Sequence, residues 1–335
     1  MGCCLCVAYP ADHYDGNFIP NWALWFILQL EEYLNRSGDR DTVDALKPKI
    51  LKLLDYFKGF ENEYGLLEKL KGWIFIEWSA ANDFVQDVNY PTNMLYALAL
   101  SAVGRIYNMP EFIAKADRLR DVIRRQSFDG EFFVDNALRE DGKLTATKNR
   151  SEVCQCFAFF SDVATPKSHP NLWKNLCEYF GPKRSRSKAF PEVHMANLFV
   201  GVMLRFEILS RYGLCQQILE ETIDYLMHMV EQTGTLWEHL GAQASCNHGF
   251  ASHICYILYR DILGAYNIDR VNKVIQLRFT PLNLTWCEGR IPVPDGFIDL
   301  RWWKDGDTIY YRLNHPAGYS VEVENLTGMK IIRKY

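Results

Sequence analysis

The chain has 335 residues, of which 48% are hydrophobic, and a formal net charge of −4. This length and composition exclude a disordered protein and allow one large domain or two ordinary ones. The sequence holds no run of 18 apolar residues, so we expect no membrane span. Its basic residues are dispersed, and the densest cluster, residues 183–188, predicts a solvated loop. Nucleic acid is therefore not an expected partner.

The amino terminus places Cys3, Cys4 and Cys6 after Gly2. It lacks the basic region of a secretory signal, and Cys6 stands where a myristoylation motif has Ser or Thr. No second cysteine pair with the spacing of metal ligands follows, so we expect neither a metal nor another cofactor. Half of the ten cysteines lie in apolar helical patterns, which favours a reducing, cytoplasmic location.

Helical periodicity runs from about residue 20 to residue 265. The first helix is predicted from Pro20 to Ser37, and the second over 42–60 with an interruption near Pro48. A long, irregular aromatic segment covers 62–87. A helical hairpin at 91–107 and 110–126 follows, with a proline at the start of each helix. Further helices are expected at about 151–163, 171–180, 193–211, 214–231 and 247–263, which gives about nine helices with no strand between them.

The pattern changes after Gly264, where apolar and polar residues begin to alternate between Gly, Pro, Asn and Asp turns. Strands are predicted at 274–279, 296–302, 308–313 and 319–324. Paired helices whose functional loops gather at one end suggest an α/α toroid. We therefore predict a mainly α protein, with an α/α-barrel domain at residues 1–268 and a small antiparallel β-sandwich at residues 269–335.

The richest segment lies between two apolar helical patterns and reads Thr-Gly-Thr-Leu-Trp-Glu-His (233–239), then Ala-Ser-Cys-Asn-His-Gly-Phe-Ala-Ser-His (244–253). Acid, imidazole, amide and indole groups in one loop suit a polyhydroxylated ligand. Glu238 could act as general base on a water, or it could be a helix-start acid favoured by the dipole. Asn247 could be an N-cap, and His248 could donate to a sugar hydroxyl or satisfy a backbone carbonyl.

Two other loops also combine aromatic and polar side chains. In residues 72–91 they include Trp78 and Asp87, which fit either a sugar-stacking platform or a loop held over the helices by its tryptophans. In residues 9–22 they include Asp15, for which turn formation before Gly16 is a sufficient explanation. The chain has no nucleophile elbow, phosphate-binding loop, dinucleotide glycine fingerprint or H-E-x-x-H motif. This argues against the common serine hydrolases, NTPases, Rossmann enzymes and zincins.

Taken together, five segments resemble bacterial α-L-rhamnosidases of glycoside hydrolase family 78. They are residues 9–22, 77–82, 88–96, 233–238 and 245–253. The similarity runs over nearly the whole chain, and the Trp-Glu and Asn-His pairs are its most specific parts. It implies an (α/α)6-toroid of the six-hairpin glycosidase type followed by a β-sandwich. It also implies inverting hydrolysis of terminal α-L-rhamnosides, with a rhamnose-containing glycan as ligand.

The resemblance assigns roles to several residues. It makes Glu238 the general base, and it places His248 near the cleaved bond and Trp78 in the wall of the sugar pocket. The expected substrate-binding residues are His248, Trp237, Trp78, Asp15, Asn247, Asp87 and Trp22.

One departure from the family is as informative as the matches. Family members carry an Asp-x-x-x-Arg-Glu-x-x-x-Trp motif before the segment matching residues 9–22, which supplies the general acid, and no copy occurs in this sequence. We therefore expect a start within a longer ancestral frame, a barrel incomplete at its N-terminus and impaired hydrolysis. Asp15, Glu77 or Asp87 could replace the acid. The alternatives are a non-catalytic carbohydrate-binding remnant, or a homo-oligomer or partner chain that covers the open barrel.

Overall fold

The computed structural model describes residues 18–335, and its internal contacts divide the chain into two compact units. The first unit contains residues 18–34 and Asp39–Arg205, and the second contains Asn35–Gly38 and Phe206–Tyr335. The predicted domain boundary after residue 268 stays a prediction. Several residues singled out from the sequence lie outside the described residues, namely Cys3, Cys4, Cys6 and Asp15.

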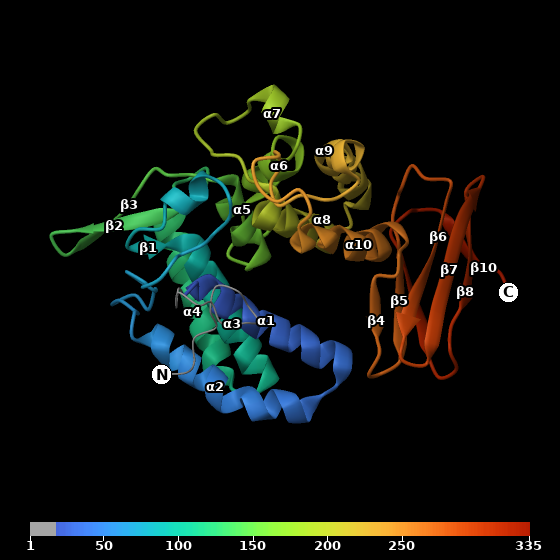
Figure 1. Ribbon diagram of the computed structural model, residues 1–335, viewed down its shortest axis with the longest axis horizontal. Helices are drawn as coiled ribbons and strands as arrows, with labels where there is room; N and C mark the ends of the chain where they lie inside the picture. Colours follow the sequence, from blue (N-terminus) through green and yellow to red (C-terminus); the bar gives the residue numbers. More distant parts are fainter. Residues whose placement is uncertain (1–17) are drawn as a thin grey trace. The chain divides into compact units, whose positions relative to one another are not determined.

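Helices form most of the first unit (Figure 1). They are α1 (Pro20–Ser37), α2 (Arg40–Lys58), α3 (Tyr90–Ile106), α4 (Pro110–Ser127), α5 (Glu152–Phe160), α6 (Pro170–Glu178) and α7 (Arg184–Ser187), followed by a π-helical turn, η2 (Leu198–Val202). The next helix, α8 (Met203–Arg211), begins in the first unit and continues from Phe206 in the second. Proline begins α3 and α4 as predicted, because the first helical turn needs no N–H from it. The predicted interruption near Pro48 is wrong: α2 runs through it, held by a buried face that includes Val43, Ile50 and Phe57.

The helix α3 is buried along almost its whole length and forms the centre of the first unit. Helix α4 packs closely against it, since a Cβ on Gly104 would come within 2.5 Å of Ile113 Cγ1. Asn89 caps α3, accepting a hydrogen bond from the Thr92 backbone N–H at 2.8 Å. Asn93, one turn later, bonds to both the N–H and the carbonyl of Leu67, at 2.7 and 3.0 Å. The irregular segment before α3 is thus fixed by amide side chains at the start of this helix.

A small antiparallel sheet combines a strand before α3 with two strands between α4 and α5, and it contradicts the prediction of no strands among the helices. Its strands are β1 (Val88–Asn89), β2 (Asn136–Glu140) and β3 (Lys143–Ala146). The turn between β2 and β3 is Asp141-Gly142, and both residues have positive φ, 47° and 80°. This is the geometry that a two-residue hairpin prefers.

The helical part of the second unit contains α9 (Cys215–Thr233) and a composite segment. The predicted continuous helix over 247–263 is instead a 3₁₀ turn, η3 (Gly249–Ser252), then α10 (His253–Ile257), then a π-helical turn, η4 (Leu258–Ile262). None of the helices within residues 18–335 combines the length and apolarity needed to cross a membrane.

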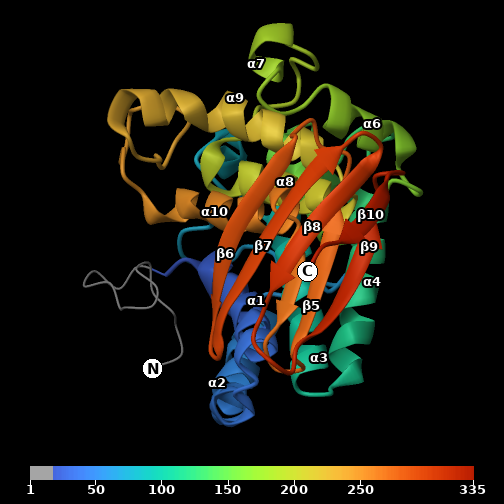
Figure 2. The same cartoon turned by 90° about the vertical axis from the view of Figure 1, so that its right-hand side faces the viewer.

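Two sheets share one core at the carboxyl end of the second unit. The first has the order β10-β8-β7-β6 and the second the order β4-β5-β9. Their bounds are β4 (Asn267–Asp269), β5 (Val274–Phe279), β6 (Trp286–Val293), β7 (Gly296–Asp305), β8 (Thr308–Asn314), β9 (Ser320–Asn325) and β10 (Lys330–Arg333). Figure 2 shows the first sheet from its outer face, with β5 behind it.

Alternate residues of the strands point into this core, among them Leu277 on β5, Leu300 on β7 and Leu313 on β8. The β-sandwich is therefore as predicted, but its expected antiparallel pairing is wrong in part. Strand β10 runs parallel to β8, and β9 runs parallel to β5. Both sheets are mixed. The closed toroid of the helical part stays a prediction.

Candidate functional site

The loop between α9 and η3 holds Glu238 and His248 together. Two backbone hydrogen bonds cross it, from Glu238 N to Ser245 O at 2.9 Å and from His248 N to Leu236 O at 3.0 Å. The Ser245 N–H also approaches the Glu238 carboxylate at 3.4 Å. Both side chains are partly exposed. The two sides of the loop are thus linked as in a hairpin, and the two residues that sequence analysis singled out share one framework.

Trp237 packs beneath this loop, and its predicted contact with substrate stays a prediction. Its side chain is 2% exposed, and its indole N–H donates to Thr233 Oγ1 at 2.8 Å. The ring of His228 packs on it edge to face, with the centroids 5.4 Å apart. Burial of an indole with a satisfied N–H stabilises the loop.

His248, and not Asn247, caps the turn that follows. Its Nδ1 accepts a hydrogen bond from the Phe250 backbone N–H at 3.1 Å. Because Nδ1 accepts, the ring proton of the neutral imidazole lies on Nε2. Asn247 is exposed one residue earlier, and its backbone bonds locally to the Ser245 hydroxyl. This capping hydrogen bond therefore sets the tautomer of His248, which is predicted to contact the sugar.

The Trp78 loop in the first unit is built on an aromatic cluster. Phe75 lies at its centre, with ring centroids 4.9 Å from Trp78, 5.4 Å from Trp73, 5.4 Å from Trp22 and 5.7 Å from Phe199. Phe75 is buried, whereas Trp22 and Trp78 are partly exposed. Both tryptophans therefore pack and also keep exposed surface, and their substrate contacts stay a prediction.

Glu77, the residue before Trp78, is a fully buried carboxylate that holds the loop in place. It accepts hydrogen bonds from the Ser79 hydroxyl at 2.8 Å and from the backbone N–H groups of Asn197 and Gly201 at 3.1 and 3.0 Å. Burial raises the pKa of Glu77 to about 8, against the opposing effect of these hydrogen bonds. At 0% exposure it is not available to protonate a ligand in solution.

Asp87 is also engaged in the fold. Its carboxylate accepts a hydrogen bond from the Arg139 backbone N–H at 2.7 Å and lies 3.9 Å from Lys69 Nζ. Its φ of 48° is the left-handed conformation that Asp tolerates better than most residues. These contacts tie β2 to the segment before α3, which gives Asp87 a structural role beside its predicted role in substrate binding.

Sequence analysis did not single out His194, which lies beside the start of α5. The backbone of His194 accepts from Glu152 N and donates to Arg150 O, both at 2.8 Å. Its exposed ring packs against that of Phe84, with the centroids 5.3 Å apart. In the sequence, the only sign of His194 was its position in a loop that ends at Asn197, the N-cap of η2. Tertiary pairing, not local sequence, brings it to the Phe84 segment.

A second buried acid, Asp135, also lies at the start of α5. It is 0% exposed; one carboxylate oxygen accepts from the Ser151 hydroxyl at 2.6 Å, and the other, Oδ2, has no hydrogen-bond partner among the described residues. Burial raises the pKa of Asp135 to about 7. Its carbonyl accepts from Tyr90 N at 2.8 Å, so it links the first turns of α3 and α5.

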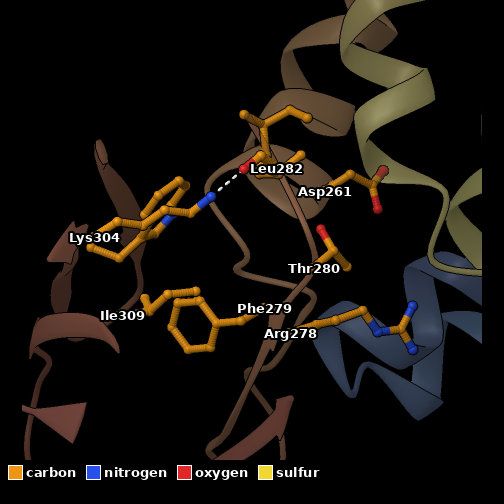
Figure 3. A pocket seen from close by; sticks show the side chains of 9 residues that line it. Asp261, Arg278, Phe279, Thr280, Leu282, Lys304 and Ile309 are labelled. Carbon is orange, nitrogen blue, oxygen red and sulfur yellow. Dashed lines mark hydrogen bonds between the residues drawn. The ribbon is translucent and has the colours of Figure 1, made fainter. Parts of the chain in front are cut away.

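The second unit also contains a small pocket between η4 and the sandwich (Figure 3). Asp261 and Thr280 line it, and Lys304 donates to the Leu282 carbonyl at its rim. It offers space for about one water molecule, so it is too small for a sugar ring. Nowhere within residues 18–335 do three His, Cys, Asp or Glu side chains form a group that could hold a metal ion.

No protein-family model matches this sequence, and no curated protein sequence does. Solved structures do. A family 78 rhamnosidase of Bacillus sp. GL1 is similar over 96% of this chain, with a TM-score of 0.81 and 21% identity. An α-L-rhamnosidase from Dictyoglumus thermophilum is similar over 91%, with a TM-score of 0.71 and 13% identity. A rhamnosidase from Klebsiella oxytoca, solved with rhamnose bound, is similar over 75%, with a TM-score of 0.59 and 16% identity.

These similarities show a shared fold. The chain covers 35%, 34% and 48% of the length of those three proteins, respectively. Its structure therefore corresponds to one part of a rhamnosidase fold.

Proposed function

We propose that this chain acts on terminal α-L-rhamnosides with Glu238 as the general base of an inverting hydrolysis. The proposal rests on the loop that carries Glu238 and His248, whose two sides are joined by backbone hydrogen bonds, in a chain whose fold is similar to that of rhamnosidases. In this mechanism the carboxylate removes a proton from the attacking water. His248 Nε2 would donate a hydrogen bond to a sugar hydroxyl close to the cleaved bond.

Inversion needs a second carboxyl group, roughly 6.5–9.5 Å from the first, to protonate the leaving oxygen. Two of the acids suggested as substitutes, Glu77 and Asp87, already accept hydrogen bonds from backbone N–H groups of the protein. The third, Asp15, lies outside the described residues. We therefore propose that these 335 residues hydrolyse substrates with poor leaving groups slowly, because general-acid assistance is worth about 10²–10⁴-fold.

Two substrates distinguish a chain that lacks only the general acid from a chain that lacks a functional rhamnoside site. p-Nitrophenyl α-L-rhamnoside releases a stable anion that needs little protonation, whereas methyl α-L-rhamnoside releases a strongly basic alkoxide. We expect measurable turnover of the first and almost none of the second. Glu238→Gln should reduce turnover of the nitrophenyl substrate by about 10²-fold or more. Glu231→Gln, which changes an exposed carboxylate on α9, is the matched control and should keep full activity.

Equal nitrophenyl rhamnoside turnover by the wild type and Glu238→Gln would refute the general-base role. Comparable turnover of both rhamnosides would refute the proposal that the chain lacks a general acid, and would mean that another carboxyl group has this role. The product anomer, read by NMR immediately after cleavage, should be the inverted β-L-rhamnose.

A further inference from the structure

The outer face of the β10-β8-β7-β6 sheet carries a row of aromatic side chains. Trp286 on β6 pairs with Trp303 on β7, and Trp303 pairs with Tyr310 on β8. Residues directly opposite on neighbouring strands point to the same side of a sheet. The buried neighbours Trp302 and Tyr311 point into the core, so these three rings point outward. We call Trp286, Trp303 and Tyr310 the aromatic row.

Two rings of the aromatic row stack on each other, and the third lies on the neighbouring strand. The rings of Trp303 and Tyr310 lie 5.8 Å apart and almost parallel, at 25°. Trp286 is 54% exposed. Across two strand spacings the row spans about 10 Å, which is the length of a disaccharide. Trp303 and Tyr310 are partly exposed, so all three rings reach solvent on this face.

Three cations lie beside the aromatic row, one at each ring. Arg301 lies 5.6 Å from the Trp286 centroid, Arg312 5.6 Å from Trp303 and Lys334 4.5 Å from Tyr310. Arg301 forms an ion pair with Glu288 at 3.2 Å. Within the described residues, no carboxylate lies within ion-pair distance of Arg312 or Lys334. The tyrosine end of the row therefore carries two cations without an ion-pair partner, although the exposed Asp305 lies on the same face of β7.

We propose that this face binds an anionic polysaccharide, a chain of pyranose rings that carry carboxylate groups. The C–H face of a pyranose is apolar and packs on the aromatic row, while the carboxylates of successive sugars pair with Arg312 and Lys334. A guanidinium binds a planar carboxylate in a bidentate geometry, which suits Arg312 to a uronate. This site lies on the outer surface of the sandwich and is separate from the Glu238 loop, so it goes beyond the proposed hydrolysis.

Charge selects this ligand over its rivals. A neutral glycan would use the rings but would leave two unpaired cations beside it. Single-stranded nucleic acid also uses rings with cations, but it needs a basic groove along its backbone. Here Glu288 and Asp299 lie on the same face and pair with Arg301 and Arg290, so the cations without an ion-pair partner are confined to the tyrosine end. Two cations suit one or two carboxylates rather than a long phosphate backbone.

Affinity electrophoresis of the full chain in gels that contain polygalacturonate, dextran or no polymer tests the proposal. We expect polygalacturonate to retard the wild type and dextran not to do so. Trp303→Ala should weaken the apparent affinity about tenfold or more, as removal of a central aromatic anchor does at interfaces. Trp303→Tyr should restore much of it. Tyr64→Ala, an exposed aromatic residue elsewhere, is the matched control.

Arg312→Gln should weaken binding and reduce its dependence on salt, whereas Arg118→Gln, an exposed arginine on α4, should not. The proposal would be refuted if the wild type were not retarded. It would also be refuted if Trp303→Ala were retarded as strongly as the wild type, because binding that does not need the aromatic row is simple ion exchange. Equal binding of an oligothymidylate would identify nucleic acid instead. Glu238→Gln should keep polygalacturonate binding, and Trp303→Ala should keep rhamnoside turnover, so each proposal can fail alone.

Discussion

The buried carboxyl of Asp135 makes the stability of the chain depend on pH in a way that can be calculated. Burial raises its pKa from the ordinary value of 3.8 to about 7. In the unfolded chain the group is ionised above pH 5, whereas in the folded chain it keeps its proton until about pH 7. The folded state therefore binds more protons across this range, and the free energy of unfolding falls as the pH rises.

The size of the effect follows from the width of the range. From pH 5 to pH 7 the two states differ by about one proton, and each pH unit is worth about 1.4 kcal/mol, so the loss is about 3 kcal/mol. Full burial leaves little solvent to screen the group. Asn cannot ionise, so Asp135→Asn should remove this dependence. Any cost from its amide hydrogens should be the same at both pH values.

Urea unfolding of the wild type and of Asp135→Asn at pH 5 and pH 8 measures the difference. We expect the variant to gain about 3 kcal/mol relative to the wild type on going from the lower to the higher pH. Asp141→Asn, in the exposed β2–β3 turn where φ is 47° and Asn is tolerated, should show no such change. A stability difference between the wild type and Asp135→Asn that is the same at both pH values would refute the reasoning.

Three further changes test the framework of the site. Gly72→Ala would place a Cβ 2.4 Å from the Phe18 carbonyl oxygen at a φ of +98°, so the free energy of unfolding in urea should fall by about 3 kcal/mol. Gly130→Ala is the control: Gly130 also has a positive φ, but its Cβ would meet no atom, so the loss should be about 1 kcal/mol. His248→Ala should lower stability by about 1 kcal/mol through loss of its cap, whereas His248→Asn should retain the cap and still lose rhamnoside turnover. Arg184→Met should cost about 3–5 kcal/mol in the same unfolding assay, because it leaves the buried Glu152 carboxylate without its ion-pair partner at 3.1 Å; an unchanged midpoint would contradict this.

Much of the helical framework could be predicted because its signals are local. Proline at Pro20, Pro91 and Pro110 fixed the starts of three helices, and these starts agree with the structure to within one residue. The same local reasoning failed at Pro48, because a buried apolar face outweighs one lost hydrogen bond. It also missed β2 and β3, although the Asp141-Gly142 pair between them is a strong hairpin signal.

For the site, the sequence by itself determined which chemistry is present, an acid and an imidazole ten residues apart in one loop. Only the tertiary structure decided how the neighbouring groups are used. Trp237 and Glu77 have the side chains of ligand-binding residues, yet one is 2% and the other 0% exposed. Likewise, the parallel pairing of β10 with β8 brings Lys334 to Tyr310 across a sheet that alternation alone predicts as antiparallel. Burial and strand order depend on contacts between residues far apart in the chain, and no local pattern encodes them.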